Sequence, residues 1–402
     1  MKPSVLKFFI VVLFILSGIC GLIYEVAWSK YLALFIGSTA YSHMIVLATF
    51  MGGLAFGSFY WGRYADKAVN QLRLYGILEI AIGVYCFAYP FFISVAETTF
   101  ISMAESMNAS AGQVSLLVLK FLLSFITLIL PTFFMGGTLP VLTKYLTKNI
   151  ADAGKDVATL YYINSLGAII GTALAGFFLI RYLSLDGTVW SAASMNLLIG
   201  GAALLLAKWV RIPAQEKIHN DNAKQETTQK FSHRIIKVAI AVAAFSGFIA
   251  MLYELTWIRL LSNILGSSTY SFSVMLIAFI SGITLGSWIV SRIISKIKNL
   301  FVFLGFCQFA TAVSMILTLP LYERLPYYLL KLSLTISNKP GNFPIFLAIE
   351  FLFCLIIMII PTTFSGMSLP VVSRIASNDI RILGKTVGSV FSINTIGTVV
   401  GA

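Results

Sequence analysis

Apolar runs of about 20 residues follow one another along the chain, separated by short polar and charged segments. Runs of this length can cross the hydrocarbon core of a membrane as α-helices. The pattern predicts six helices in the first half, over 5–28, 40–62, 73–95, 114–146, 157–180 and 186–208. It predicts five in the second half, over 235–257, 269–291, 300–322, 344–375 and 386–402.

The second half of this pattern repeats the first. SGICGLIYEVAW at residue 17 corresponds to SGFIAMLYELTW at residue 246, an offset of 229 residues. PTFFMGGTLP at residue 131 corresponds to PTTFSGMSLP at residue 361, an offset of 230 residues. A register kept over so many positions indicates an internal duplication, as many transporters show. We therefore predict an all-α polytopic membrane protein made of two parallel six-helix repeats and resembling the major facilitators in architecture.

The first run also resembles a signal peptide, but because it recurs in mid-chain we interpret it as a retained membrane helix.

The duplication divides the chain into three parts: a first membrane unit over 1–208, a linker over 209–234 and a second membrane unit over 235–402. The linker is charged and rich in Gln and Asn, which is typical of a flexible tether. Ala402 aligns with Thr172, inside the fifth helix of the first unit. We therefore expect this chain to be a fragment of a longer protein, without the twelfth helix and part of the eleventh.

Composition and charge agree with the membrane assignment and orient it. Only 11% of the residues are charged, whereas soluble domains average about 25%. The net charge of +13 comes largely from Lys and Arg in alternate short loops, so it indicates orientation in a lipid bilayer and not nucleic-acid binding. We expect the N-terminus and the linker on the cytoplasmic side. The four cysteines lie in apolar stretches without metal-binding spacing, and they predict neither a disulfide nor a metal site.

Each unit carries one glutamate inside its first apolar run, in the pattern Tyr-Glu-x-x-Trp. These residues are Glu25 and Glu254, preceded by Tyr24 and Tyr253. An ionised carboxylate at membrane depth is costly unless it is paired or hydrated, and such residues commonly mark ion or proton pathways. One hypothesis is that these residues bind a cation, a proton or a substrate in a cavity shared by the two units.

A second interpretation places both glutamates at the outer membrane interface. Glu25 would then pair with Lys30, and Glu254 with Arg259. The tryptophan one turn after each glutamate would serve as an interfacial anchor. The helical rise brings Glu25 close to the far edge of the hydrocarbon core. The sequence leaves both interpretations open.

Three further ionisable residues interrupt apolar runs. Lys120 and Glu350 occupy equivalent positions at the offset of 230 residues and carry opposite charges. We hypothesise an ion pair between them across the interface of the two units; the alternative is that each side chain extends separately to the membrane surface. Glu79 aligns with Gln308 and is a candidate for substrate or ion binding, or for an interfacial or hydrogen-bonded structural role.

Prolines and small residues recur in both units. Pro131 and Pro140 correspond to Pro361 and Pro370. They predict a broken or kinked helix, either a gate or a static bend. Small residues and asparagines predict close helix packing at Asn164, Gly167, Gly171, Asn394, Gly397, Gly53, Gly57, Gly282 and Gly286.

The motifs SG-x4-5-YE-x2-W, GS(S/T)-x-YS, PT-x3-G-x2-LP and N-x2-G-x3-G occur once in each unit. Together they resemble the membrane part of bacterial fused major-facilitator/spermidine-synthase-like proteins, over nearly the whole chain. The resemblance implies the bacterial cytoplasmic (inner) membrane, a polyamine-related or other cationic solute, and a fused or associated aminopropyltransferase-like domain. The chain shows no Gly-rich loop of the kind that this domain needs, so we assign no catalytic residue and no cofactor.

The segment WGRYADKAVNQLRLYG also resembles the major facilitator loop between the second and third helices, through Gly62, Asp66, Lys67 and Arg73, although its spacing departs from that pattern. The second unit has no matching acid.

We predict a transporter-like module that moves a small solute between its units. One alternative is a non-transporting anchor for an aminopropyltransferase-like enzyme, and another is a membrane-bound enzyme. A water-accessible cavity between the units would favour transport.

Overall fold

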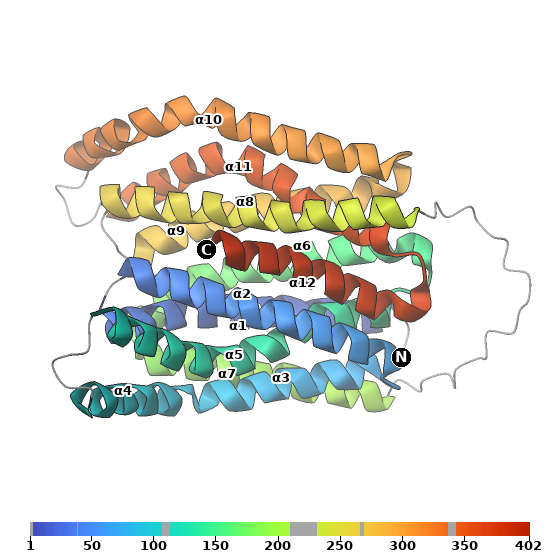
Figure 1. Ribbon diagram of the computed structural model, residues 1–402, viewed down its shortest axis with the longest axis horizontal. Coiled ribbons are helices and arrows are strands. Elements are labelled where there is room, and N and C mark those ends of the chain that lie inside the picture. The colour runs from blue at the N-terminus through green and yellow to red at the C-terminus, as the bar shows by residue number, and fades with distance from the viewer. Residues whose placement is uncertain (1–2, 38, 107–112, 210–230, 266–268, 337–342) are drawn as a thin grey trace, which may run out of the picture.

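The computed structural model describes residues 3–37, 39–106, 113–209, 231–265, 269–336 and 343–402. Its helices run side by side along the longest axis of one bundle (Figure 1). Those of the first unit are α1 (Pro3–Ile36), α2 (Thr39–Lys67), α3 (Gln71–Phe87), α4 (Tyr89–Ser106), α5 (Gln113–Leu146), α6 (Ala153–Leu174) and α7 (Ile180–Trp209). Those of the second unit are α8 (His233–Leu265), α9 (Thr269–Ile293), α10 (Leu300–Ile336), α11 (Phe343–Ala376) and α12 (Leu383–Gly401). The described residues contain no strand, and the predicted all-α architecture is confirmed.

The helix contacts repeat in the two units. In the first, α1 packs against α6 and α2 against α5; in the second, α8 packs against α12 and α9 against α11. These are the same pairs once the sequence offset is applied. Two further contacts join the units, α2 with α12 and α6 with α9. They too are equivalent to each other, so the packing has the pseudo-twofold symmetry expected of parallel repeats.

Several helix boundaries differ from the sequence prediction. The helix expected over 73–95 is two helices, α3 and α4, bent by 50°. The helix expected over 300–322 continues to Ile336 in α10, through Pro320 and Pro326. The gap expected between 180 and 186 is present only as a local interruption: the five-residue π-helical turn η2 (Ala175–Leu179) precedes α7, and Ser184 has a φ of 63°.

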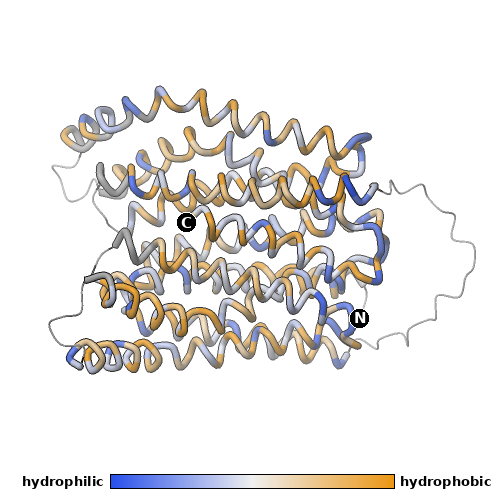
Figure 2. The backbone as a smooth tube through the Cα atoms, in the orientation of Figure 1, coloured by the Kyte–Doolittle hydropathy of each residue, from blue (hydrophilic) through white to orange (hydrophobic). Residues whose placement is uncertain are grey.

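Long apolar helices dominate the described chain. Eight helical stretches are long and apolar enough to cross a membrane, or nine if the bent α3–α4 pair is one span. One of the eight, Ile150–Trp209, has 60 residues and contains both α6 and α7, so it is too long for a single crossing of a core about 30 Å thick. Figure 2 shows hydrophobic residues along the helices and hydrophilic residues gathered mainly at the end near the N-terminus.

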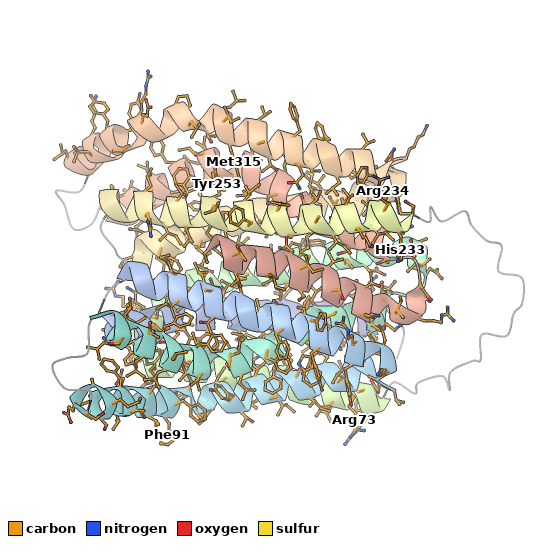
Figure 3. The ribbon with its side chains drawn as sticks, viewed as in Figure 1. Arg73, Phe91, His233, Arg234, Tyr253 and Met315 are labelled. Carbon is orange, nitrogen blue, oxygen red and sulfur yellow. The ribbon has the colours of Figure 1, made fainter. Side chains whose placement is uncertain are left out.

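We call this end of the bundle the basic end. His233 and Arg234 lie at this end, and Arg73 lies toward it at the opposite edge of the bundle (Figure 3). It also holds the last turns of α2, α5 and α11, which carry Lys67, Lys144 and Arg374.

Glycines allow close approach of the helices within each unit. A Cβ at Gly57 would overlap the backbone of Phe133 on α5, and one at its counterpart Gly286 would overlap Thr363 on α11. The other predicted packing glycines also face a neighbouring helix at overlapping distance: Gly53 and Gly282 face Thr132 and Thr362, Gly167 and Gly171 face Ile15 and Ile19, and Gly397 faces Ala244. These contacts fix the helices whose other faces line the interior of the bundle.

Candidate functional site

A cavity of about 310 Å³ lies between the two units. This volume is in the range of small-molecule sites. Its lining comes from α1, α2, α5 and α6 of the first unit and from the equivalent helices α8, α9, α11 and α12 of the second. Duplicated residues line it in pairs: Ser17 and Ser246, Glu25 and Glu254, Phe50 and Phe279, Asn164 and Asn394, and Gly136 and Gly366.

Both glutamates of the Tyr-Glu motif line this cavity. Glu25 is 4% exposed and Glu254 is 7% exposed. Within the described part of the chain neither carboxylate forms an ion pair, so the expected pairs with Lys30 and Arg259 are not present. Trp28 and Trp257 are fully buried and do not act as interfacial anchors. The geometry therefore agrees with the shared-cavity interpretation, while binding by these residues stays a prediction.

The tyrosines of the motif lie outside the cavity lining. Tyr24 is fully buried, stacks on Trp28 with ring centroids 5.3 Å apart, and donates a hydrogen bond of 2.7 Å to Asn196 Oδ1 on α7. Tyr253, visible on α8 in Figure 3, lies edge-on to Trp257. Each glutamate and the tyrosine before it therefore point in different directions, as neighbouring positions on a helix must.

Glu79 lies inside the first unit, between α1, α3 and α7, and is fully buried. Ser17 Oγ donates a hydrogen bond of 2.6 Å to Glu79 Oε1, and Asn196 Nδ2 donates one of 2.5 Å to Glu79 Oε2. Since Ser17 also lines the cavity, a continuous chain of hydrogen bonds leads from the cavity wall through Glu79 and Asn196 to Tyr24. The structure thus places Glu79 behind the cavity and not within it.

The expected ion pair between Lys120 and Glu350 is wrong. Lys120 Nζ donates a hydrogen bond of 3.2 Å to the carbonyl of Ile36, the last residue of α1, and lies 4.8 Å from the ring centre of Phe100. The last carbonyls of a helix lack intrahelical donors and carry partial negative charge, so they attract the ammonium group locally. Glu350 is 1% exposed on α11 and forms no ion pair within the described residues.

The two predicted packing asparagines contribute to both packing and cavity. The carbonyl of Asn164 faces Gly18 of α1, and the carbonyl of Asn394 faces Gly247 of α8. Both residues also line the cavity.

In the described part of the chain, no group of three or more potential metal ligands among His, Cys, Asp and Glu comes together.

Equivalent helix pairing within two units and a cavity between the units, lined by equivalent residues of both, are the arrangement of the major facilitator fold. A sequence model of the Major Facilitator Superfamily matches residues 9–402. The chain belongs to this superfamily. No curated protein matches it in sequence.

One solved structure agrees with the fold, and a second is similar to a lower degree. The bacterial homologue of the iron transporter ferroportin, in an outward-facing state, has a TM-score of 0.56 at 11% identity, covering 97% of this chain and 90% of that one. The major facilitator transporter FucP in the outward conformation has a TM-score of 0.47 at 16% identity, covering 96% of this chain and 90% of that one. At 11% identity the likeness to the ferroportin homologue concerns the fold alone.

In this major facilitator, the segments between the duplicated prolines form part of the cavity wall. α5 and α11 continue through Pro131, Pro140, Pro361 and Pro370, so the predicted helix break is not seen, and gating stays a prediction. A proline leaves the carbonyl four residues earlier without its helical donor. Ser58 on α2 donates a hydrogen bond of 2.8 Å to the carbonyl that Pro140 leaves free, that of Gly136.

The second unit repeats this arrangement. The hydroxyl of Ser287 on α9 is shared between two acceptors: the carbonyl of Gly366 at 3.0 Å, which Pro370 leaves free, and that of Ile283 on its own helix at 2.9 Å. In the first unit the other freed carbonyl, that of Thr127, accepts a hydrogen bond of 3.0 Å from Tyr85. Side chains of neighbouring helices therefore replace missing backbone donors next to the cavity, as membrane interiors require.

The resemblance of WGRYADK to the major facilitator loop leads to a contact between the units at the basic end. Asp66 Oδ1 lies 3.0 Å from Lys144 Nζ. The same carboxylate accepts hydrogen bonds of 2.9 and 2.7 Å from the backbone N–H groups of Gly384 and Lys385 in the first turn of α12. Negative charge is favourable at a helix N-terminus, so Asp66 attaches the first unit to α12.

Sequence reasoning did not single out Ser17, Ser58 or Asn196 as site residues. Ser58 and Ser287 could have been found, because each follows a duplicated glycine and each unit places its prolines at the same spacing. Asn196 is a polar residue in the otherwise apolar run of α7. Ser17 could also have been found, because it begins the SG-x4-5-YE-x2-W motif that recurs at Ser246.

Proposed function

We propose that the chain is a secondary transporter that moves a small organic cation through the cavity between its units. The observation that carries the proposal is the pair of buried carboxylates, Glu25 and Glu254, on opposite units of one cavity. Two carboxylates without a cationic partner are costly in such a place. A bound cation would offset that cost, and rocking of the units would then expose it to either side.

The lining supports an organic cation of modest size. Phe50, Phe279, Tyr161 and Phe391 contribute aromatic side chains to the same cavity, and aromatic faces attract alkylammonium groups. The motif resemblance to spermidine-synthase-like fusion proteins favours a polyamine, whose separated amino groups could reach a carboxylate on each unit. The Lys and Arg loops at the basic end favour a cytoplasmic location for that end, in a bacterial inner membrane.

The test is uptake of radiolabelled spermidine into liposomes that contain the purified full chain. We expect Glu25→Gln and Glu254→Gln each to reduce uptake about tenfold or more, because each removes a charge-assisted contact worth about 1.5–3 kcal/mol. The double variant is expected to fall to the level of empty liposomes. Glu97→Gln, an exposed acid on α4, is the matched control and is expected to transport as the parent does.

Full spermidine uptake by the double variant would contradict the assignment of the two glutamates. If the parent chain transports neither spermidine nor other amines, and the substitutions change only stability, the alternative role as a membrane anchor for an aminopropyltransferase-like enzyme is favoured instead.

A further inference from the structure

Glu79 is a buried acid that the proposed cation site does not use. Both of its carboxylate oxygens accept hydrogen bonds, but the donors, Ser17 and Asn196, are neutral. Within the described residues it forms no ion pair with Lys, Arg or His. A buried carboxylate without a cation becomes much less costly when it binds a proton. The surroundings therefore suit a group that alternates between two protonation states.

The hydroxyl group of Ser17 gives Glu79 a route to the cavity. Ser17 lines the cavity and lies 2.6 Å from Glu79 Oε1. It shares one face of α1 with Gly21 and Glu25, at spacings of four residues, and all three line the cavity. A proton that enters the cavity can therefore reach Glu79 without crossing apolar packing.

Only the first unit has this arrangement. The equivalent of Glu79 is Gln308, whose Nε2 donates a hydrogen bond of 2.7 Å to Ser368 Oγ on α11. Ser246, the equivalent of Ser17, lines the cavity. The duplicated fold thus accepts an amide at this position, so retention of a carboxyl group in the first unit needs an explanation other than packing.

We propose that Glu79 binds and releases a proton through Ser17 during the transport cycle, which makes the proton the coupling ion and the first unit its carrier. In the binding step, a hydronium ion in the cavity gives a proton to Ser17 Oγ and becomes water, while the Ser17 hydroxyl proton passes to Glu79 Oε1. The carboxylate becomes a neutral carboxylic acid, and one positive charge has entered the protein. Release reverses the same transfers.

Other titratable side chains surround this site. Cys20 and Tyr24 face it from α1 and Tyr75 from α3, with Cys86 of α3 beyond them. α7 contributes the neutral amide of Asn196. Because thiols and phenols are neutral near pH 7, the carboxyl group is the member of this cluster whose protonation changes the charge.

The first arm of the test does not depend on transport. Infrared spectra of the reconstituted full chain are recorded across a pH series, and the carbonyl stretch of protonated carboxylic acids is followed. We expect one component to be lost in Glu79→Gln and retained in Glu97→Gln. Ser17→Ala is expected to keep the component but to slow its shift in deuterated water. An unchanged band in Glu79→Gln would overturn the proposal.

The second arm, which rests on the proposed transport function, separates coupling from solute binding. Glu79→Gln is expected to lose spermidine uptake driven by a proton gradient but to keep exchange of labelled for unlabelled spermidine without a gradient. Gradient-driven uptake equal to that of the parent would overturn the coupling role. If the parent does not transport spermidine, that solute assignment fails, while the infrared arm still decides whether Glu79 is the proton site.

Discussion

At the residue scale, the pairing of Ser58 with Gly136 and of Ser287 with Gly366 explains why glycine-serine and proline motifs recur together. Each proline removes a backbone donor beside the cavity, and each serine supplies a replacement from the neighbouring helix. The glycine before each serine lets the two helices approach closely enough for this hydrogen bond. The two motifs are parts of one contact between α2 and α5, and of its copy between α9 and α11.

Replacing Ser58 with Ala leaves the carbonyl of Gly136 without a donor. We expect a loss of about 1 kcal/mol, and about twice that for the Ser58→Ala/Ser287→Ala double variant, since the sites are separate. The measurement is the apparent Tm of the purified protein in detergent. Ser194→Ala is the control, because this exposed serine bonds only to its own helix. Equal Tm values for Ser58→Ala and the control would contradict this role.

At the element scale, hydrophobic periodicity predicted the existence of the helices better than their ends. The bend between α3 and α4, the extension of α10 and the continuity of α5 and α11 through their prolines were not predictable in this way. Helix ends depend on local backbone geometry and on tertiary donors such as Ser58, which a window of apolar residues does not register. The interruption near Ser184 was expected, because Ser184, Asp186 and Gly187 stand between two apolar runs.

The attachment of α12 to the first unit can be tested at Asp66. Asp66→Asn removes the charge that faces Lys144 and the first turn of α12; the Asp66 and Lys144 side chains are both largely buried from solvent. We expect a loss of about 1.5–3 kcal/mol, seen as a lower apparent Tm. The exposed pair of Asp379 with Arg381 provides the control, since an exposed pair contributes little. A Tm for Asp66→Asn no lower than that of Asp379→Asn would argue against the attachment.

At the scale of the whole molecule, the duplication was the most informative part of the sequence. It identified the two units, the equivalent helix pairs and the glutamates that the structure places on one cavity. The ion pair that the duplication suggested between Lys120 and Glu350 is not formed. Equivalent positions approach each other only if both face the pseudo-twofold axis, and Lys120 instead faces the end of α1. The direction in which a buried residue points depends on helix rotation and packing, which the apolar periodicity of an all-round hydrophobic helix does not specify.

Rocking of the units requires that α2 and α12 separate at the basic end. A substitution in the contact between these two helices should favour their separation. A Cβ at Gly62 would lie 2.6 Å from the carbonyl oxygen of Gly384, so Gly62→Leu should prevent the contact. We expect faster labelling of a cysteine placed at Ser365, in the cavity wall, by a membrane-impermeant maleimide added at the basic end. Gly52→Leu is the control on the same helix, since no atom lies within 4 Å of its added Cβ. Equal labelling rates would show that this contact does not close the cavity.

The two contacts between the units at the basic end differ in chemistry, although duplication made them equivalent. In the one between α2 and α12, Asp66 accepts hydrogen bonds from the first turn of α12, and Lys144 donates hydrogen bonds to the carbonyls of Ile380 and Arg381 just before it. Its counterpart has Ser295 and Arg374 at these positions, with Gly154 packed against Arg374 and Ile294. The charged side chains of Asp66 and Lys144 are both largely buried, so dissolved salt screens them only weakly, whereas removing either charge leaves the other without its partner. Substitution of either charged residue should therefore loosen one side of the molecule first, so that the basic end opens as a hinge about the α6–α9 side.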